Sequence, residues 1–349
     1  MADLRRIAYL LERAGEPSYR VRAFRGAATT LDGLEPAELA RRAGSSSLRE
    51  LKGVGEVTER CVLESLAGVE PVYLRRMEAA QAEESGFDPG TAGAAIRAML
   101  RGDCHTHSDW SDGGSPISEM ARAARDLGHE YVVLTDHSPR LTVANGLSAQ
   151  RLEQQLDVVA TVNAELAPFR LLTGIEVDIL DDGALDQSDE LLSRLDLVVA
   201  SVHSKLRMPA AQMTERMIGA IANPHTDVLG HCTGRLVTGR RRPESEFDPE
   251  LVFAACARFG VAVEINSRPE RLDPPKRLLR LAVEAGCLVS IDTDAHAPGQ
   301  LEWQQHGCER AALCAVPPAS IVNSWSAGEL LAWTADHWAR PEPNSSEHR

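Results

Sequence analysis

Residues 104–113 read CHTHSDWSDG and residues 131–137 read YVVLTDH, so that histidines and aspartates stand at the ends of short aliphatic runs. Runs of this kind alternate with stretches long enough to form helices. This alternation predicts repeated βα units with parallel strands, and about 240 residues from 101 onward suit a barrel. The expected strands are 131–134, 169–177, 195–202, 227–230, 261–265 and 288–291, and the expected helices are 116–127, 149–166, 249–259 and 275–285.

Five of these strands, together with the first strand, which ends at His105-Thr106-His107, place a histidine or a carboxylate at their carboxyl ends. A single histidine at a strand end is usually an ordinary hydrogen-bonded residue, but six independent placements argue against chance. In a parallel barrel these ends converge on one rim, where catalytic groups lie. The candidate metal ligands are His105, His107, His137, Glu176, His203, His231, Asp294 and His296, with Asp112 in a loop as the ninth.

The spacing of these residues also points to metal binding. Alternate residues of a strand face the same way, so His105 and His107 can face one ion, and Asp294 and His296 repeat that spacing. Imidazole nitrogens together with carboxylate oxygens suit Zn²⁺, Mn²⁺ or Fe²⁺. Because there are more candidates than the four or five ligands of one ion, we expect two or three divalent metals.

Seven sequence motifs carry a resemblance to a known family. Read in order, they are CHTHSDWSDG (104–113), LTDHS (134–138), GIE (174–176), ASVH (200–203), GHCTGR (230–235), VEIN (263–266) and SIDTDAH (290–296). Together they resemble the successive motifs of the PHP (polymerase and histidinol phosphatase) family. The resemblance implies a distorted seven-stranded, TIM-like βα barrel over 101–340, with a trinuclear site built from all nine candidate ligands.

The first 80 residues differ in character from the rest. Apolar positions recur at helical spacing over 4–11, 31–39 and 57–66, which predicts a small all-α module. In it, the turn Gly53-Val54-Gly55 resembles a helix-hairpin-helix motif, whose backbone amides approach a phosphate. With Arg20, Arg22 and Arg25, the module resembles the N-terminal DNA-binding domain of X-family DNA polymerases. The alternative is a helical cap on the larger domain.

Charge supports a boundary between the two parts. Of 37 Lys+Arg and 51 Asp+Glu, residues 1–80 hold 13 and 12, which makes this part about +1 and the remainder about −15. We therefore expect a helical domain at 1–80, a linker at 81–100, a barrel at 101–340 and a disordered tail at 341–349. Seven cysteines without paired spacing favour a reducing compartment, and no membrane or signal segment is evident. A cytoplasmic protein is expected.

The order of the modules is similar to the two ends of bacterial family X polymerases. About 20 residues separate the modules where a palm and thumb need some 200, so we expect no polymerase activity. The expectation is a phosphoesterase in which a metal-activated water hydrolyses a phosphate ester. Arg235 and Lys205 are candidates for phosphate contact, and Asp136 for orienting a ligand histidine.

Several functions remain open on the sequence. A 3′–5′ exonuclease on DNA is favoured by the N-terminal module, and a phosphatase for small phosphomonoesters, such as a histidinol-phosphatase-like enzyme, is the alternative. A catalytically idle barrel in a DNA-binding or DNA-repair accessory protein is a third possibility. An amidohydrolase-type barrel is disfavoured because no lysine stands at a strand end in the bridging position.

Overall fold

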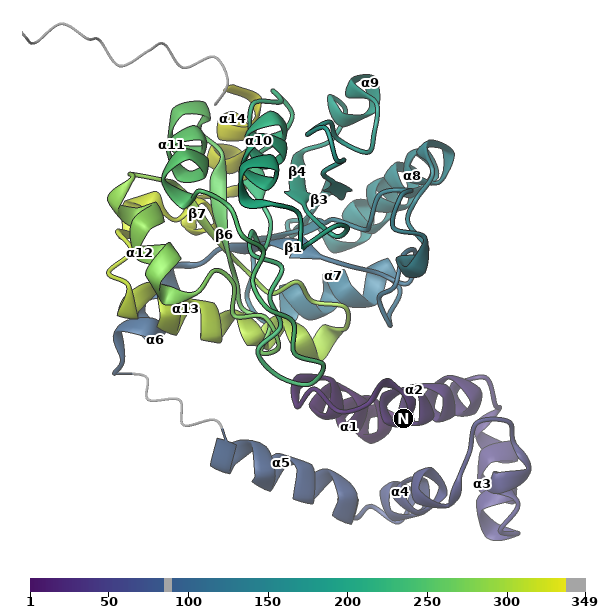
Figure 1. Ribbon diagram of the computed structural model, residues 1–349. Coiled ribbons are helices and arrows are strands. Elements are labelled where there is room, and N and C mark those ends of the chain that lie inside the picture. Colours follow the sequence, from purple (N-terminus) through teal and green to yellow (C-terminus); the bar gives the residue numbers. More distant parts are fainter. Residues whose placement is uncertain (85–89, 337–349) are drawn as a thin grey trace, which may run out of the picture. The chain divides into compact units, whose positions relative to one another are not determined.

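The core of the barrel is a sheet of seven parallel strands in the order of the chain, from β1 to β7 (Figure 1). A computed structural model describes residues 1–84 and 90–336. Every residue of six strands is buried, and in β3 only the first residue is exposed, as expected where helices cover the sheet. The strands are β1 (Gly102–Thr106), β2 (Tyr131–Leu134), β3 (Arg170–Asp178), β4 (Leu197–Ser201), β5 (Val228–Leu229), β6 (Ala262–Asn266) and β7 (Val289–Asp292).

The chain divides into two compact units. The N-terminal unit contains residues 1–84 with 297–302, and the barrel unit contains 90–296 with 303–336. Helices of the N-terminal unit are α1 (Ala2–Arg13), α2 (Ser18–Asp32), α3 (Pro36–Gly44), η1 (Leu48–Glu50), α4 (Glu56–Leu66) and α5 (Val72–Glu84). Those that follow are α6 (Ala92–Met99), α7 (Ile117–Asp126), η2 (Thr142–Ala144), α8 (Ala149–Leu166), α9 (Asp189–Leu192), α10 (Ala210–Ile221), α11 (Pro249–Phe259), α12 (Lys276–Glu284), η3 (Pro298–Trp303), α13 (Gln304–Leu313), η4 (Pro318–Ser320), η5 (Val322–Ser324) and α14 (Ala327–Asp336).

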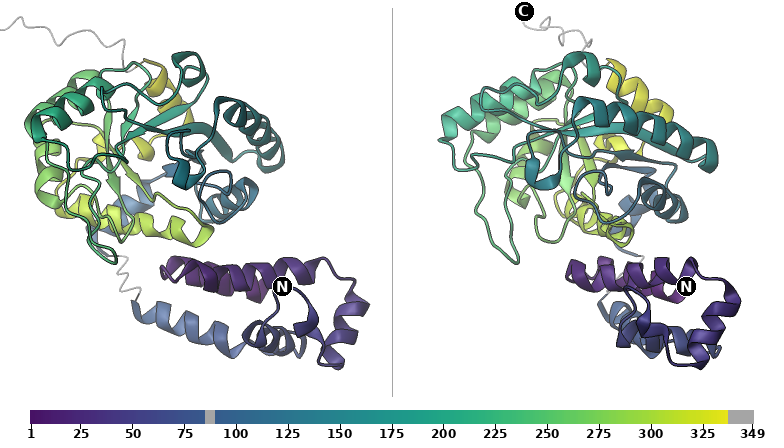
Figure 2. Two further views of the ribbon diagram at one scale, coloured as in Figure 1. Left: turned by 45° about the vertical axis from the view of Figure 1, so that its right-hand side comes forward. Right: turned by 90° about the vertical axis from the view of Figure 1, so that its right-hand side faces the viewer.

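The alternating α/β barrel and the all-helical N-terminal region are confirmed (Figure 2). The apolar pattern at 31–39 does not form one helix, because α2 ends at Asp32 and α3 begins at Pro36. The expected linker, 81–100, includes helix α6, which packs against α13. The expected tail, 341–349, lies outside the described residues. Among the residues described, no helix has both the length and the apolar character needed to cross a membrane.

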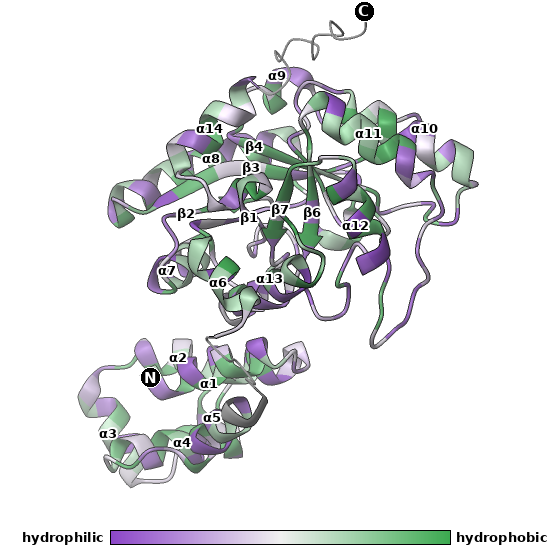
Figure 3. Ribbon diagram, turned by 90° about the vertical axis from the view of Figure 1, so that its left-hand side faces the viewer, coloured by the Kyte–Doolittle hydropathy of each residue, from purple (hydrophilic) through white to green (hydrophobic). Residues whose placement is uncertain are grey.

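Local sequence signals set the ends of the barrel helices. In α11, Asp248 caps the first turn by accepting hydrogen bonds from the amides of Glu250 and Leu251 at 3.0 and 3.1 Å, and Pro249 occupies the first position. Gly260 ends the helix with a φ of 71°, a conformation that glycine adopts without strain. Each helix thus presents an apolar face to the strands, which are the most hydrophobic part of the unit (Figure 3).

Side chains, more than main-chain pairing, hold the last strand against the first. The amide groups of Gln304 and Asn323 both donate to the carbonyl oxygens of Gly102 in β1 and Ile291 in β7, at 2.7–3.1 Å. The carboxylate of Asp292 accepts from the amide of Cys104 at 2.8 Å. This seam fixes the relative position of two strands whose carboxyl ends carry four candidate ligands, His105, His107, Asp294 and His296.

The seam provides a test of how the barrel is held closed. Replacing Gln304 by alanine removes two buried hydrogen bonds and leaves a cavity, which should lower the free energy of unfolding by about 2–3 kcal/mol. Urea denaturation would measure this loss. The matched control is Gln305→Ala. The side chain of Gln305 donates a hydrogen bond to Glu309 on the same helix and takes no part in the seam. An equal effect of the two substitutions would contradict the role of Gln304 in the seam.

Candidate metal centre

One buried carboxylate, Glu176 near the end of β3, gathers five histidines around it. Its Oε2 atom lies 2.9 Å from His137 Nδ1, and 3.3 and 3.6 Å from the Nε2 atoms of His105 and His107. Its Oε1 atom lies 2.9 Å from His231 Nε2 and 3.2 Å from His203 Nε2. These histidines come from the ends of β1, β2, β4 and β5, so the barrel brings together residues that are far apart in the sequence.

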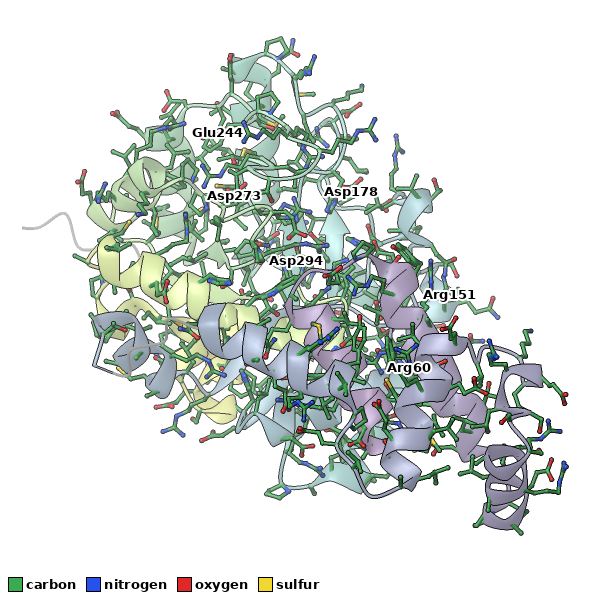
Figure 4. The ribbon with its side chains drawn as sticks, turned by 90° about the horizontal axis from the view of Figure 1, so that it is seen from below. Arg60, Arg151, Asp178, Glu244, Asp273 and Asp294 are labelled. Atoms are coloured by element: carbon green, nitrogen blue, oxygen red, sulfur yellow. The ribbon has the colours of Figure 1, made fainter. Side chains whose placement is uncertain are left out.

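Two further carboxylates extend the cluster on the side of β1 and β7. Asp294 Oδ1 is 3.5 Å from His107 Nε2, while Asp112 Oδ1 is 3.2 Å from His296 Nε2 and 3.5 Å from His137 Nε2. Asp294 and Glu176 are buried, but Asp112 is 38% exposed and therefore forms the open side of the cluster. Figure 4 labels Asp294 together with Asp178 from β3.

Eight of the nine donors form three overlapping groups suited to metal ions. In each of three groups the ligand atoms lie within 4.8 Å of one another, and His107 and His137 belong to two groups each. His231 joins the assembly through Glu176. The groups are His107, Asp112, His137 and His296; His105, His107 and Asp294; and His137, Glu176 and His203.

Unsatisfied polar atoms support the fit of this site to cations. Buried polar atoms nearly always have hydrogen-bond partners, so a concentration of exceptions requires an explanation. Within the described part of the chain, seven such atoms without a partner belong to the cluster, and a positive ion would satisfy them. They are His105 Nε2, both ring nitrogens of His107, His137 Nδ1, Glu176 Oε2, His203 Nε2 and His231 Nδ1.

Other carboxylates orient the ligand histidines from behind. Glu264 in β6 lies 2.6 Å from His105 Nδ1 and accepts the backbone amide of His231 at 2.5 Å. Asp178 lies 2.9 Å from His203 Nδ1. Such partners fix the ring orientation and leave the opposite nitrogen to face the metal. Glu264 belongs to the motif VEIN at 263–266, and Asp178 stands two residues after Glu176 on the same strand.

Asp136 has a different position from the one expected. Its carboxylate accepts hydrogen bonds from the amide and hydroxyl of Ser108, the hydroxyl of Ser111 and the amide side chain of Gln155, at 2.5–2.8 Å. Burial raises the pKa of Asp136 above its ordinary value, against the effect of these hydrogen bonds. Asp136 therefore holds the loop that carries Asp112, and among the described residues it makes no hydrogen bond or ion pair with His137.

Two arginines that the sequence reading missed contact the cluster. Arg271 Nε donates to Asp294 Oδ2 at 3.0 Å, and Arg268 Nη1 lies 3.5 Å from Asp294 Oδ1 and 3.1 Å from His296 Nδ1. Arg271 Nη1 is buried and has no hydrogen-bond partner among the described residues. Both arginines follow β6, and the only available signal was their place after a strand of the expected barrel.

The two cations proposed from the sequence lie elsewhere. The guanidinium of Arg235 donates to the carbonyl oxygens of Arg271 and Leu272, and lies 3.5 Å from Glu244. It thus supports the segment that carries Arg268 and Arg271. Lys205 is exposed on the loop after β4 and pairs with Asp181. The structure brings neither side chain into contact with the nine donors.

Charge balance within the cluster shifts several pKa values. Burial alone would raise the pKa of Glu176, but His105, His203 and His137 hold it well below its ordinary range. Burial likewise opposes ionisation of Asp294, yet Arg268 and Arg271 keep its pKa well below the ordinary value. Burial lowers the pKa of His203, and Glu176 and Asp178 outweigh this effect and raise it to about 9. The carboxylates are therefore ready to bind cations at neutral pH.

The candidate DNA-binding residues of the N-terminal unit have mixed positions. Arg25 forms a two-point ion pair with the buried carboxylate of Glu12, and Arg20 pairs with Glu16 and Tyr73. Arg22 is exposed and makes no ion pair within the described ranges. The turn Gly53-Val54-Gly55 precedes α4, with Gly53 at a φ of 86° and Val54 buried. Of the candidate DNA-binding residues, Arg22 and the turn at 53–55 therefore remain free to contact DNA.

Comparisons with known proteins agree with the site. The family model of the PHP domain matches residues 103–267. The DNA polymerase/3′-5′ exonuclease PolX of Bacillus subtilis is 38% identical over 254 residues, or 72% of this chain, and the chain spans 44% of the length of that relative. A probable phosphatase of Thermoanaerobacter sp. is 30% identical over 205 residues, which cover 56% of this chain and 78% of that protein.

One similar solved structure is histidinol phosphate phosphatase from Lactococcus lactis, complexed with zinc, L-histidinol and phosphate. The similarity covers 61% of this chain and 92% of the phosphatase chain. The TM-score is 0.45 and the sequence identity is 17%.

Glu264 offers a test of metal retention that leaves every candidate ligand in place. Glu264→Gln should weaken metal binding about 10- to 100-fold, because the buried carboxylate that orients His105 is lost. Competition with a chelator, followed by elemental analysis, would measure the change. Glu130→Gln, on the exposed segment before β2, is the control. Metal retention equal to that of the unsubstituted protein would contradict the orienting role.

The raised pKa of His203 predicts a pH dependence in the metal-free protein. A histidine whose folded pKa is about 9, against an ordinary value of 6.5, stabilises the fold fully below pH 6.5 and loses that contribution as the pH rises through 9. Urea denaturation in the presence of a chelator should show this decline. In His203→Gln the decline should be smaller, with a remainder from His105, whose pKa is also raised. Identical pH profiles would refute the assignment.

Proposed function

The chain belongs to the PHP family of metal-dependent phosphoesterases, and from this premise we propose that it removes nucleotides from the 3′ ends of DNA by hydrolysing phosphodiester bonds. The observation that carries the proposal is the cluster of nine buried or half-buried donors around Glu176 and Asp294. The named activity of PolX from Bacillus subtilis, similar over 72% of this chain, supports DNA as the substrate.

We assign the nine donors to two or three divalent ions, since eight of them form three overlapping groups and His231 contacts Glu176. Histidine and carboxylate ligands suit Zn²⁺, Mn²⁺ or Fe²⁺. Ions held in such a site lower the pKa of bound water and neutralise charge on a phosphoryl group. Glu176 lies between the histidines of several strands and is the natural bridging ligand, while Asp112 on the open side faces the direction from which substrate enters.

Positive side chains of the barrel would complete the recognition of phosphate. Arg271 holds Asp294 with Nε, and its buried Nη1 remains available to an oxygen of the substrate. Arg268, next to both Asp294 and His296, is placed for the same task. A guanidinium binds a phosphate in a planar, two-point geometry, which favours arginine at such a position. In this proposal Arg235 supports both residues from behind.

The N-terminal unit would add a DNA contact on a different unit from the one that carries the metal centre. Glycines in the turn at 53–55 allow the backbone to approach a phosphate closely, and the positive end of α4 follows the turn. Arg22 supplies an exposed charge on α2. This contact would position the strand without reading its sequence.

A second candidate is a phosphatase for small phosphomonoesters, for which the cluster would serve equally well. The relatives named as probable phosphatases favour it, since this chain covers 78% of the one from Thermoanaerobacter sp.. The exonuclease would hydrolyse a phosphodiester bond of a DNA strand, whereas the phosphatase would remove a terminal phosphate from a small molecule. Parallel assays of single-stranded DNA and of histidinol phosphate, with Mn²⁺ added, would separate them.

Removal of two ligands tests the assigned site directly. His105→Ala together with Asp294→Ala should lower hydrolysis of every phosphate ester about a thousandfold or more, because the group of His105, His107 and Asp294 loses two of its three donors. Initial rates with Mn²⁺ would measure this. The matched control, His225→Ala with Asp189→Ala, changes the same residue types outside the cluster. Full activity without His105 and Asp294 would show that hydrolysis occurs elsewhere, and absence of hydrolysis in the unsubstituted protein would favour an idle DNA-binding barrel.

A further inference from the structure

A β-hairpin follows the ligand His231 and projects from the barrel between β5 and α11 (Figure 2). Leu236 and Arg242 pair in antiparallel fashion, with both backbone hydrogen bonds at 3.0 Å, and Gly239 takes a φ of 60° in the turn. We call residues 236–242 the arm. Its turn consists of Thr238, Gly239, Arg240 and Arg241, so that two consecutive arginines stand at the tip.

The arm is joined to the metal centre by a short series of contacts. The amide of Val237 donates to the carbonyl oxygen of Glu270 at 2.7 Å. Glu270 lies between Arg268 and Arg271, which both contact Asp294. At the base of the arm, Arg242 Nε donates to the carbonyl oxygen of Gly234 at 2.6 Å. The arm is therefore fixed at the same end of the barrel as the nine donors.

The charge of the arm contrasts with that of the rest of the barrel. Arg240 and Arg241 are exposed, and neither side chain has an ion pair or hydrogen bond to any residue that the structure describes. Arg207 is exposed in the same way on the neighbouring loop, where the adjacent Leu206 packs against Gly234 at the base of the arm. Three unpaired guanidinium groups thus extend from a part of the chain whose formal charge is about −15.

Such an arrangement suits a polyanion that extends beyond the metal centre. A small phosphomonoester has its only phosphate at the metals, so charges on a projecting arm contribute little to holding it. A DNA strand whose end is at the metals carries further phosphates outward, and each one paired with an arginine releases condensed counterions. Such contacts fix the position of the strand and read no sequence.

We propose that Arg207, Arg240 and Arg241 bind the phosphate backbone of single-stranded DNA and guide its 3′ end to the metal centre. This inference rests on the proposed function, hydrolysis at the 3′ ends of DNA, and adds which residues of the barrel unit hold the strand. It also makes the barrel unit itself a DNA-binding surface, separate from the turn and Arg22 of the N-terminal unit.

The test compares DNA binding and hydrolysis by the full chain and a triple variant, Arg207→Ala/Arg240→Ala/Arg241→Ala. Fluorescence anisotropy with a short labelled single strand in EDTA measures binding at several salt concentrations. We expect at least about tenfold weaker binding and a salt dependence reduced by about 2 in log–log slope, since each lost phosphate contact removes about 0.7. With Mn²⁺, the loss of kcat/KM on DNA should exceed the loss on bis(p-nitrophenyl) phosphate at least tenfold.

Two control variants distinguish charge at the arm from general effects. Arg125→Ala/Arg170→Ala/Arg194→Ala makes the same change in net charge at residues that precede β2 and β4 or begin β3, and so lie toward the other end of the barrel. It should bind DNA as the unsubstituted protein does. Arg207→Lys/Arg240→Lys/Arg241→Lys keeps the charge and should keep most of the affinity.

The outcomes separate the two proposals. If DNA is hydrolysed and the arm variant matches the control in affinity and salt slope, the arm inference is wrong while the proposed function stands. If bis(p-nitrophenyl) phosphate is hydrolysed but DNA is neither bound nor cleaved, the arm inference fails together with DNA as the substrate, and the enzyme acts on small phosphate esters. If no ester is hydrolysed with any metal, the proposed function fails, and the anisotropy result alone then decides whether the arm binds DNA.

Discussion

The buried carboxylate of Glu176, with five histidines within 3.6 Å, is the interaction on which the rest of the barrel depends. A charge removed from water is costly unless it is paired and hydrogen-bonded. Around Glu176 this is achieved by rings from four other strand ends, which are held in turn by Glu264 and Asp178. The carboxylate and the histidines that compensate one another's burial also form the cation site. The metal-binding site is therefore a large part of the polar core of the barrel.

The sequence predicts much of the fold because its signals are local. The bounds of β2, α8 and α11 agree with the expected segments, since apolar runs, caps and glycine ends lie within a few residues of each other. The rule that catalytic groups follow barrel strands found eight of the nine donors that the structure brings together, and Asp112 came from a loop. The same rule does not say which side chains contact each other. It therefore pointed to Arg235 as the phosphate-binding arginine and not to Arg271, because the contact of Arg271 with Asp294 joins residues 23 positions apart and leaves no local pattern in the sequence.

The arginines of the N-terminal unit show a similar limit. Spacing marked Arg20, Arg22 and Arg25 alike as candidates for a DNA-binding face, but spacing does not reveal which charges are already paired. Glu12 is buried and holds Arg25, and Glu16 with Tyr73 holds Arg20. An unpaired arginine is the one free to meet a phosphate, and this criterion identifies Arg22 here and Arg240 and Arg241 in the barrel.

The seam between β1 and β7 has a consequence for how the protein is made. Synthesis proceeds from the amino end, and Gln304 and Asn323, which join the two strands, are translated after every candidate ligand. Asp294 and His296 are themselves the last ligands to leave the ribosome. A nascent chain therefore displays histidines from β1 to β5 before the site can close around an ion. Correct metal loading thus requires the chain to have emerged through Asn323, when the complete set of donors and the side chains of the seam are present.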